Sequence, residues 1–227
     1  MTMQNAVNQL YQAHLERMQV IRGLRSWLDD HGFQELICPI LSPAVPAEPT
    51  IYPFVTHWNR QLDHEINSMP LFLPLSPERA MKHYLSLGFA ECYSIGHCCR
   101  NMEAKGNTHH PEFLMLEWYR RDRDYHAIMD DTKALLLFLQ QKINHSSVLE
   151  FQGARYDLTH WQTLSVDALW QEKFVISLRE CLDYDVISAL ASARGYNVTT
   201  ATWEQLFNQL FLNEIEPYFP AEPFFFD

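Results

Sequence analysis

Arg100, Phe113 and Glu117 are the residues of this sequence whose types and spacing suit chemistry on a charged ligand. They lie in residues 91–119, which predict two strands joined by a long polar loop. Alternation along the strands places Arg100 on a face of small residues and places Phe113 and Glu117 together on one face of the returning strand. A guanidinium can bind a phosphate oxygen, a phenyl ring can stack on a base, and a carboxylate can bind an ammonium. The stretch therefore predicts a site for a nucleotide and an amine, and a hairpin with a merely structural salt bridge stays open as the alternative.

The two faces of this predicted hairpin differ in character. The face with Arg100 is floored by Ser94, Gly96 and Cys98, whose small side chains leave room for a ligand. The other face of the returning strand carries only apolar side chains, those of Leu114, Leu116 and Trp118. We expect that apolar face to be core.

Composition limits the kind of protein to which such a hairpin can belong. The 227 residues suit one large domain or two small ones, and with 47% hydrophobic and 13% aromatic residues they can fill a sizeable core. We expect a single domain spanning residues 1–227. A net charge of -11 opposes general affinity for nucleic acid. No stretch is long and apolar enough to span a bilayer, so the sequence predicts a cytoplasmic protein with no membrane partner. Five cysteines without a C-x-x-C pair favour reduced thiols over a disulfide framework.

The elements around the hairpin follow from periodicity and turn residues, and together they predict an α+β fold with a mostly antiparallel sheet. Helices are expected over residues 4–30 and 128–143, which should flank the sheet, and over a segment that Ser76 and Pro77 open and Gly88 closes. The remaining expected elements are an edge strand over 33–41 with Pro39 in it, strands over 54–58 and 71–75, a hairpin over 148–158, short helices over 160–211 and a strand over 223–227.

Several familiar sites are missing from the sequence. It contains no G-x-x-x-x-G-K-[ST], G-x-G-x-x-G, G-x-S-x-G or H-E-x-x-H motif. Histidines and cysteines crowd the hairpin, yet no pair has the spacing of a zinc finger and alternation separates His97 from Cys98, so no metal ligands are predicted. Glu78 stands in the first turn of a predicted helix, where interaction with the helix dipole is the simple explanation.

Arg100 together with residues 109–119, HHPEFLMLEWY, resembles motif 2 of the class II aminoacyl-tRNA synthetases, particularly of their lysyl branch. Gly32-Phe33 followed by Pro39 resembles motif 1, and Ser76-Pro77-Glu78 resembles the segment that precedes motif 2. The residues before the motif 1 region leave no room for an N-terminal anticodon-binding domain. The closer likeness is therefore to the truncated paralogues that attach lysine or β-lysine to elongation factor P, and it covers residues 17–227.

The resemblance implies a role for each matching residue. Arg100 would hold the α-phosphate of ATP and the carboxylate of the amino acid, and Phe113 would stack on adenine. Glu117 would receive the side-chain ammonium and Glu78 the other amino group. Met102 stands where the family has a glutamate, and a shift of one residue would give that place to Glu103. The other implied site residues line the amino-acid pocket or shape the loop near the nucleotide: Tyr119, His109 and Glu112.

The reaction implied by the resemblance is activation of lysine or β-lysine with ATP and Mg²⁺, followed by transfer to a lysine of elongation factor P or, as the second choice, to tRNA. The resemblance also implies a homodimer formed through the motif 1 region. In the family, a metal-binding glutamate and the motif 3 arginine follow a strand like residues 224–227, so we expect a C-terminally incomplete catalytic domain. A catalytically inactive module that binds ATP or the amino acid, or that regulates a partner, stays open as the alternative.

Overall fold

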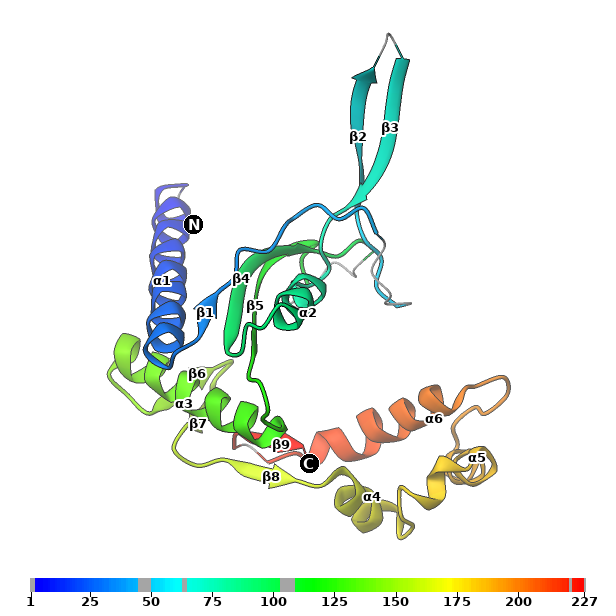
Figure 1. Ribbon diagram of the computed structural model, residues 1–227. Helices are drawn as coiled ribbons and strands as arrows, with labels where there is room; N and C mark the ends of the chain where they lie inside the picture. The colour runs from blue at the N-terminus through cyan, green and yellow to red at the C-terminus, as the bar shows by residue number, and fades with distance from the viewer. Residues whose placement is uncertain (1–2, 45–49, 63–64, 103–108, 221, 227) are drawn as a thin grey trace. The chain divides into compact units, whose positions relative to one another are not determined.

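The computed structural model describes residues 3–44, 50–62, 65–102, 109–220 and 222–226 (Figure 1). The chain divides into two compact units, Met1–Ile128 and Met129–Asp227, which we describe separately. Helices and strands occur in both units, and three of the five strand pairings within them are antiparallel, β2–β3, β4–β5 and β6–β7. The α+β fold class predicted from the sequence is confirmed, whereas the single domain over residues 1–227 stays a prediction.

Helix α1, Met3–Asp30, opens the first unit and matches the predicted amphipathic helix. Among its residues with described burial, the buried ones lie toward the C-terminal end, at Gly23, Trp27 and Leu28. Gly32 ends the helix in the left-handed region, with φ of 84°, and the Phe33 N–H donates to the carbonyl of Leu28 at 3.0 Å. The helix end is therefore fixed by a glycine, as the sequence indicated.

Strand β1, Gln34–Glu35, is much shorter than the strand predicted over residues 33–41. It pairs in parallel with β4 at the edge of a three-stranded sheet of order β1-β4-β5, so the predicted edge position is confirmed. The Leu36 N–H still donates to the Tyr93 carbonyl at 2.7 Å, but Pro39 has no N–H to continue a ladder. The predicted strand was too long because apolar composition does not show where a neighbouring strand is available for pairing.

The hairpin of β4, Cys92–Cys99, and β5, Glu112–Tyr119, is antiparallel and lies where the sequence predicted it. Helix α2, Glu78–Ser86, packs against β4. The contact is a cluster in which Leu36, Met81 and Cys92 are buried. Residues of β5 are half-buried on both faces from Phe113 onward, so the face predicted to be core is only partly covered.

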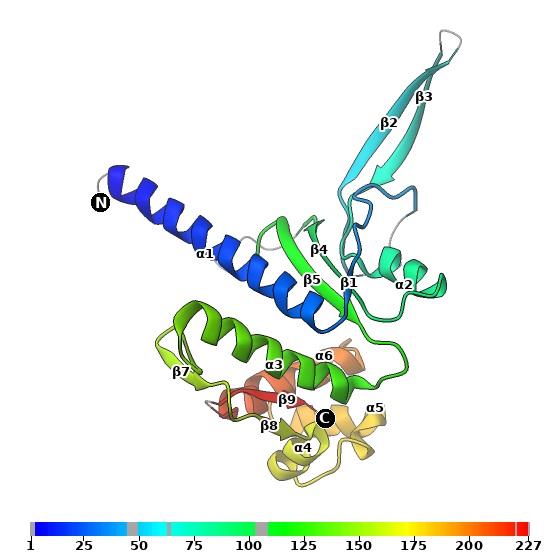
Figure 2. The same ribbon diagram turned by 60° about the vertical axis from the view of Figure 1, so that its left-hand side comes forward.

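Strands β2, Val55–Leu62, and β3, Glu65–Phe72, form a separate two-stranded ribbon that projects from the rest of the first unit in both views (Figures 1 and 2). The sequence predicted only residues 54–58 and 71–75 as strands. The ribbon continues through polar pairs such as Asn59 with Ser68, because backbone hydrogen bonds in a ladder do not require apolar side chains. The predicted extents were therefore wrong: both strands are longer at their polar ends, and residues 54 and 73–75, which were predicted as strand, lie outside them.

Two helix starts also differ from the predictions. Pro77 precedes the first residue of α2 instead of standing in its first turn, although the Ser76 hydroxyl still accepts the Glu78 N–H at 3.3 Å. Helix α3, Tyr125–Asn144, begins three residues before the predicted Ile128. Its start is marked by Asp124, whose carboxylate accepts the His126 N–H at 3.1 Å. Asp124, an acidic residue about one turn before Ile128, marks the helix start, which hydrophobic periodicity alone does not show.

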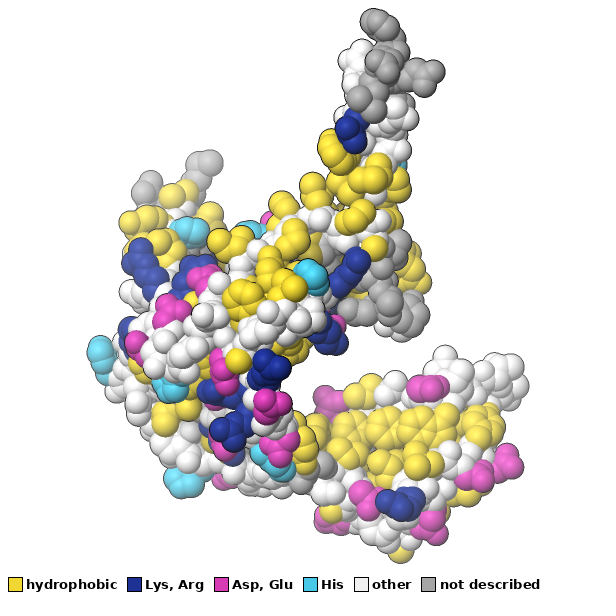
Figure 3. All heavy atoms as spheres, viewed as in Figure 1, with side chains coloured by type: hydrophobic (Ala, Val, Ile, Leu, Met, Phe, Trp, Pro, Cys, Tyr) yellow, Lys and Arg dark blue, Asp and Glu magenta, His cyan; other side chains and the backbone are white. Residues whose placement is uncertain are grey.

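The second unit contains most of α3 and the remaining elements: β6, Val148–Phe151; β7, Ala154–Asp157; β8, Gln162–Leu164; α4, Val166–Phe174; α5, Tyr184–Ala193; α6, Trp203–Leu210; and β9, Phe224–Phe226. Gln152 and Gly153 turn the predicted β6–β7 hairpin with positive φ angles of 52° and 83°. The core surrounds Trp170, and Phe207 stacks between Trp170 and Trp203. Figure 3 shows hydrophobic side chains gathered over α6.

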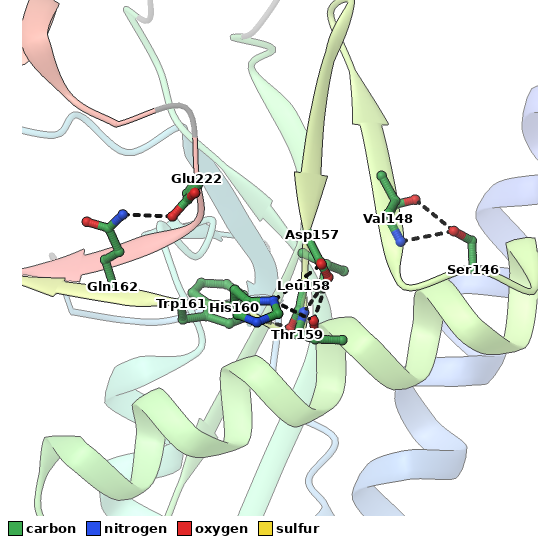
Figure 4. Close-up of polar contacts among 9 residues, drawn as sticks. All are labelled: Ser146, Val148, Asp157, Leu158, Thr159, His160, Trp161, Gln162 and Glu222. Carbon is green, nitrogen blue, oxygen red and sulfur yellow. Dashed lines mark hydrogen bonds and ion pairs between the residues drawn. The ribbon is translucent and has the colours of Figure 1, made fainter.

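The C-terminal strand β9 pairs in parallel with β8, so the strand predicted from the three consecutive phenylalanines is confirmed. Trp161 stacks on Phe225 with 4.9 Å between the ring centroids. Figure 4 shows the turn before β8, in which the Asp157 carboxylate accepts the Thr159 hydroxyl at 2.7 Å. Hydrogen bonds from Thr159 lower the pKa of Asp157. The exposed Asp157, Thr159 and His160 thus build a turn.

None of the helices in the described parts of the chain combines the length and the apolar character that a membrane span requires.

Candidate functional site

The register of the β4–β5 hairpin brings the predicted site residues to one face. Cys98 pairs with Phe113, Gly96 with Met115, and Ser94 with Glu117. Paired residues of an antiparallel ladder project on the same side, so the aromatic ring and the carboxylate share the face of the small residues. Phe113 and Glu117 are separated by about 13 Å along the strand, since each residue advances it by about 3.3 Å.

Arg100 follows β4 and approaches Phe113 at one end of this face. Its guanidinium carbon lies 5.4 Å from the centroid of the Phe113 ring, which is a cation–π contact. The Arg100 Nε–H donates to the Leu75 carbonyl at 3.3 Å, and the Arg100 backbone N–H donates to the Pro111 carbonyl at 2.9 Å. These bonds fix the half-buried side chain against β5 and the residues before α2. The predicted convergence of the cation and the ring is thus present in the structure.

Glu117 and Tyr119 stand at the other end of the face. The Tyr119 hydroxyl donates to Glu117 Oε1 at 2.6 Å. Burial raises the pKa of Tyr119, and the hydrogen bond to Glu117 and the charges of Glu117 and Glu78 raise it further. Glu78, in the first turn of α2, is therefore within electrostatic reach of this end. Both acidic residues predicted to bind amino groups thus act on the Tyr119 phenol, Glu117 of β5 through a hydrogen bond and Glu78 of α2 through its charge.

The floor between the two ends is formed by small side chains. Ser94 and Cys98 are buried, at 2% and 1% exposure. Burial is the first cause that raises the pKa of Cys98, to about 11, while the charge of Arg100 acts to lower it and that of Glu117 to raise it. Along β4, Cys98 lies opposite Phe113, between Arg100 and the Ser94–Glu117 pair.

Gly96 occupies the centre of this floor. A Cβ added there would have only Ser94 Oγ within 4 Å among its described neighbours, at 3.9 Å. No positive φ requires glycine at this strand position. The structure thus leaves space for a Cβ above Gly96, and the expectation of room for a ligand over this floor stays a prediction.

The remaining predicted site residues are not gathered on this face. Glu112 pairs with Cys99 on the opposite side, where its exposed carboxylate lies 3.0 Å from His97 Nδ1. His109 is exposed in the segment that precedes β5. Glu103 lies outside the described residues. Met102, just before that gap, is exposed and adopts the left-handed region with φ of 61°, an uncommon conformation for a long side chain.

Among the residues that the structure describes, no group of three or more His, Cys, Asp or Glu side chains could hold a metal ion. A cavity of about 440 Å³ is lined by Gly32, Gln34 and residues 87–91. None of the predicted site residues lines this cavity, which lies near the start of β4.

Two residues of the site were not predicted from the sequence. Lys82 forms an ion pair with Glu78, one helical turn before it. Glu78 and Lys82 are four residues apart in a helix that Ser76 and Pro77 predict. This spacing could have indicated the ion pair from the sequence. Cys38 packs against the cluster of Leu36, Met81 and Cys92, and burial raises its pKa. No local pattern indicates Cys38, because its position depends on a contact distant in sequence.

The sequence model of the family described as tRNA synthetases class II (D, K and N) matches residues 2–208 of the chain. Curated relatives with the name lysine–tRNA ligase are also similar to it. That of Chloroflexus aurantiacus is 28% identical over 213 residues, which is 93% of this chain and 42% of the relative. That of Thioalkalivibrio sulfidiphilus is 33% identical over 181 residues, which is 79% of this chain and 35% of the relative.

A third relative, the lysine–tRNA ligase of Syntrophomonas wolfei, is 34% identical over 145 residues, which is 64% of this chain and 28% of the relative. The chain thus spans less than half the length of each of these relatives. The similarity covers both the β4–β5 hairpin and α2, the elements that carry the candidate site.

Proposed function

The chain belongs to the class II tRNA synthetases of the D, K and N group, and from this premise we propose that it activates a lysine-type amino acid with ATP. The observation that carries the proposal is the hairpin face, on which Arg100 and Phe113 stand at one end and Glu117 and Tyr119 at the other. The names of the relatives, lysine–tRNA ligase, support lysine or a close analogue as the amino acid.

The nucleotide is assigned to the Arg100 end. The Phe113 ring offers a stacking surface for adenine, and the guanidinium beside it offers a planar donor pair for oxygens of the α-phosphate and the substrate carboxylate. A carboxylate oxygen of the amino acid attacks the α-phosphorus, the bond to the β-phosphate breaks, and pyrophosphate leaves. This step needs alignment and neutralisation of charge more than a nucleophile from the protein.

The amino acid is assigned to the Glu117 end. Glu117 is proposed to bind the side-chain ammonium, with Tyr119 fixing the orientation of the carboxylate through the 2.6 Å hydrogen bond. Glu78 is proposed to bind the other amino group, and the floor over Gly96 leaves space for the methylene groups. The separation of about 13 Å between Phe113 and Glu117 suits an extended ligand with a base at one end and an amine at the other.

ATP and Mg²⁺ are the proposed cofactors. Mg²⁺ is commonly held by substrate phosphates and one or two carboxylates, without a cage of protein ligands. The ion would neutralise the phosphates, while Arg100 orients the reacting carboxylate. His109, Glu112 and Glu103 remain predicted residues of the nucleotide loop.

The acceptor is proposed to be an amine of elongation factor P or the terminal hydroxyl of tRNA. The resemblance to truncated paralogues favours the first, and the names of the relatives support the second. Either acceptor would attack the carbonyl of the aminoacyl adenylate and release AMP. Incubating the protein with radiolabelled lysine, ATP and each acceptor in turn distinguishes them by which acceptor becomes labelled.

A homodimer through the motif 1 region is part of the proposal. Apolar side chains are exposed both on α1 and on the segment after β1, where Ile37 is 91% exposed. The exposed members on α1 include Val7, Leu10 and Tyr11. Exposed apolar side chains of this kind are available for an interaction surface. A molar mass near 26.7 kDa by light scattering at micromolar concentration would rule out the dimer.

Lysine-dependent exchange of pyrophosphate into ATP tests the proposed reaction. We expect the wild-type protein with Mg²⁺ to show exchange with lysine or β-lysine, and we expect Arg100→Ala to reduce it to background. Binding of ATP and lysine without exchange would instead favour the inactive binding module. A wild-type protein that binds neither substrate contradicts the whole assignment.

A further inference from the structure

Lys82 lies beside the residues that we assign to the amino acid. Residues 78, 81, 82 and 85 share one side of α2, because they are three or four positions apart. Met81 is buried in the cluster with Leu36 and Cys92, and Leu85 packs against that cluster. Glu78 and Lys82 therefore border the side of α2 that packs on the hairpin.

The charges of this region act on one another. The Lys82 ammonium forms an ion pair with the Glu78 carboxylate, and this hydrogen bond is the first cause that raises the pKa of Lys82. The charge of Glu117 raises the pKa of Lys82 as well. Tyr119 packs against the same cluster, donates to Glu117 and is affected by the charge of Glu78. The Glu78–Lys82 ion pair and the Glu117–Tyr119 hydrogen bond thus lie beside the same apolar cluster of Leu36, Met81 and Cys92.

We propose that Lys82 is a specificity-determining residue of the amino-acid subsite, where its ammonium pairs with Glu78 in the ligand-free protein and is displaced by the α-amino group of the substrate. The inference rests on the proposed function, since it assigns Glu78 to that amino group. Two ammonium groups repel each other, so the substrate and Lys82 compete for the same carboxylate. A ligand with a side-chain ammonium but no α-amino group does not displace Lys82.

Calorimetric titration with L-lysine and with 6-aminohexanoate, which is lysine without its α-amino group, tests this competition. Lys82→Gln should bind lysine about two- to fivefold more tightly than the wild type, the range expected for loss of an exposed ion pair. Its affinity for 6-aminohexanoate should be unchanged. Lys82→Arg keeps the charge and should behave like the wild type. Arg155→Gln removes a charge from the exposed pair with Glu150 and serves as the control without effect.

The gain from Lys82→Gln should disappear when Glu78→Gln is present in the same chain, because the competition is for that carboxylate. The inference is overturned if Lys82→Gln binds lysine no more tightly than the wild type. That result would mean that Lys82 holds the Glu78 carboxylate in place and does not compete with the substrate. It is also overturned if both ligands bind more tightly by the same factor, which indicates a long-range charge effect. A wild-type protein that binds neither lysine nor ATP overturns the proposed function and this inference together.

Discussion

At the scale of single residues, the proposed nucleotide site depends on Arg100. Its guanidinium lies over Phe113 and is held by the Leu75 carbonyl, so it is oriented before a nucleotide binds. Arg100→Ala should weaken ATP binding by on the order of 2–5 kcal/mol, because a phosphate would lose its charged partner in a partly dehydrated site. Titration calorimetry with ATP and Mg²⁺ measures the loss. Unchanged affinity, with an unchanged melting temperature, would count against the nucleotide assignment.

Gly96 permits a test that separates binding from stability. Valine fits a strand better than glycine does, and the added Cβ would meet only Ser94 Oγ, at 3.9 Å, among the described neighbours. Gly96→Val should therefore leave the melting temperature unchanged or raise it. The same side chain would fill the floor of the site and weaken binding of the adenylate about tenfold or more, because overfilling a packed space costs about 1–3 kcal/mol. Gly96→Ala is the graded control.

A destabilised Gly96→Val protein would show that the space above Gly96 is closed by other parts of the molecule. A stable variant with wild-type affinity for the adenylate would place the ligand elsewhere. The two measurements, calorimetric melting and ligand titration, thus give independent outcomes for the fold and for the site.

At the scale of elements, α1 is tied to the sheet by a polar network around Tyr93. The Tyr93 hydroxyl donates to Asp29 of α1 at 2.9 Å and to Glu35 of β1 at 3.3 Å. Arg25 of α1 donates to the same Glu35 carboxylate through two nitrogens, with Nη2 at 2.9 Å. Tyr93 is fully buried, so its hydroxyl needs these acceptors. The network fixes the position of the last turns of α1.

This network predicts a loss of stability at alkaline pH. Burial first, and then the hydrogen bond to Asp29, raise the pKa of Tyr93, so the folded state favours the neutral phenol. The stabilising contribution is therefore complete below the ordinary tyrosine pKa of about 10 and is lost as the pH rises above it. The free energy of unfolding in urea should fall above about pH 10 in the wild type.

The matched variant is Tyr93→Phe, which should be less stable at pH 7 and should show a shallower decline above pH 10. The loss at pH 7 should be about 0.5–1.5 kcal/mol, since a hydrogen bond is lost but its acceptors, Asp29 and Glu35, remain exposed to water. Parallel declines of the two proteins with pH would mean that Tyr93 does not carry the effect.

In the second unit, Phe207 joins the aromatic side chains of α4 and α6. Its ring centroid lies 5.3 Å from that of Trp170, 5.2 Å from that of Trp203 and 5.5 Å from that of Phe211, with nearly parallel planes. Phe207→Ala should lower the free energy of unfolding by about 3 kcal/mol, the lower end for phenylalanine because the ring is half-buried. Phe207→Leu should lose less. Urea unfolding followed by tryptophan fluorescence measures both, and equal losses would exclude the stacking as the cause.

At the scale of the whole molecule, the sequence predicted the elements that carry the site better than it predicted their surroundings. Alternation alone predicted that Phe113 and Glu117 share one face of β5, because side chains an even number of positions apart in a strand point to the same side. Glu112 was assigned to the nucleotide loop by resemblance, yet its carboxylate lies on the other face with His97.

Other features depend on contacts that no local pattern contains. The ribbon of β2 and β3 extends through polar residues that lack strand-like composition. Strand β1 is short because pairing with β4 ends after Glu35. Lys82 joins the site only because α2 packs on β4 through Met81. Each of these three features is determined by tertiary packing, which hydrophobic periodicity does not predict.

The central claim is that one hairpin face binds a nucleotide at Arg100 and a side-chain ammonium at Glu117. Calorimetric titration with a non-hydrolysable lysyl-adenylate analogue, and with the norleucyl analogue that lacks the terminal amine, tests both ends at once. We predict that the wild type prefers the lysyl analogue and that Glu117→Gln removes this preference while still binding both compounds through their adenosine part. Equal affinity of the wild type for the two analogues, or a preference that survives in Glu117→Gln, would contradict the account.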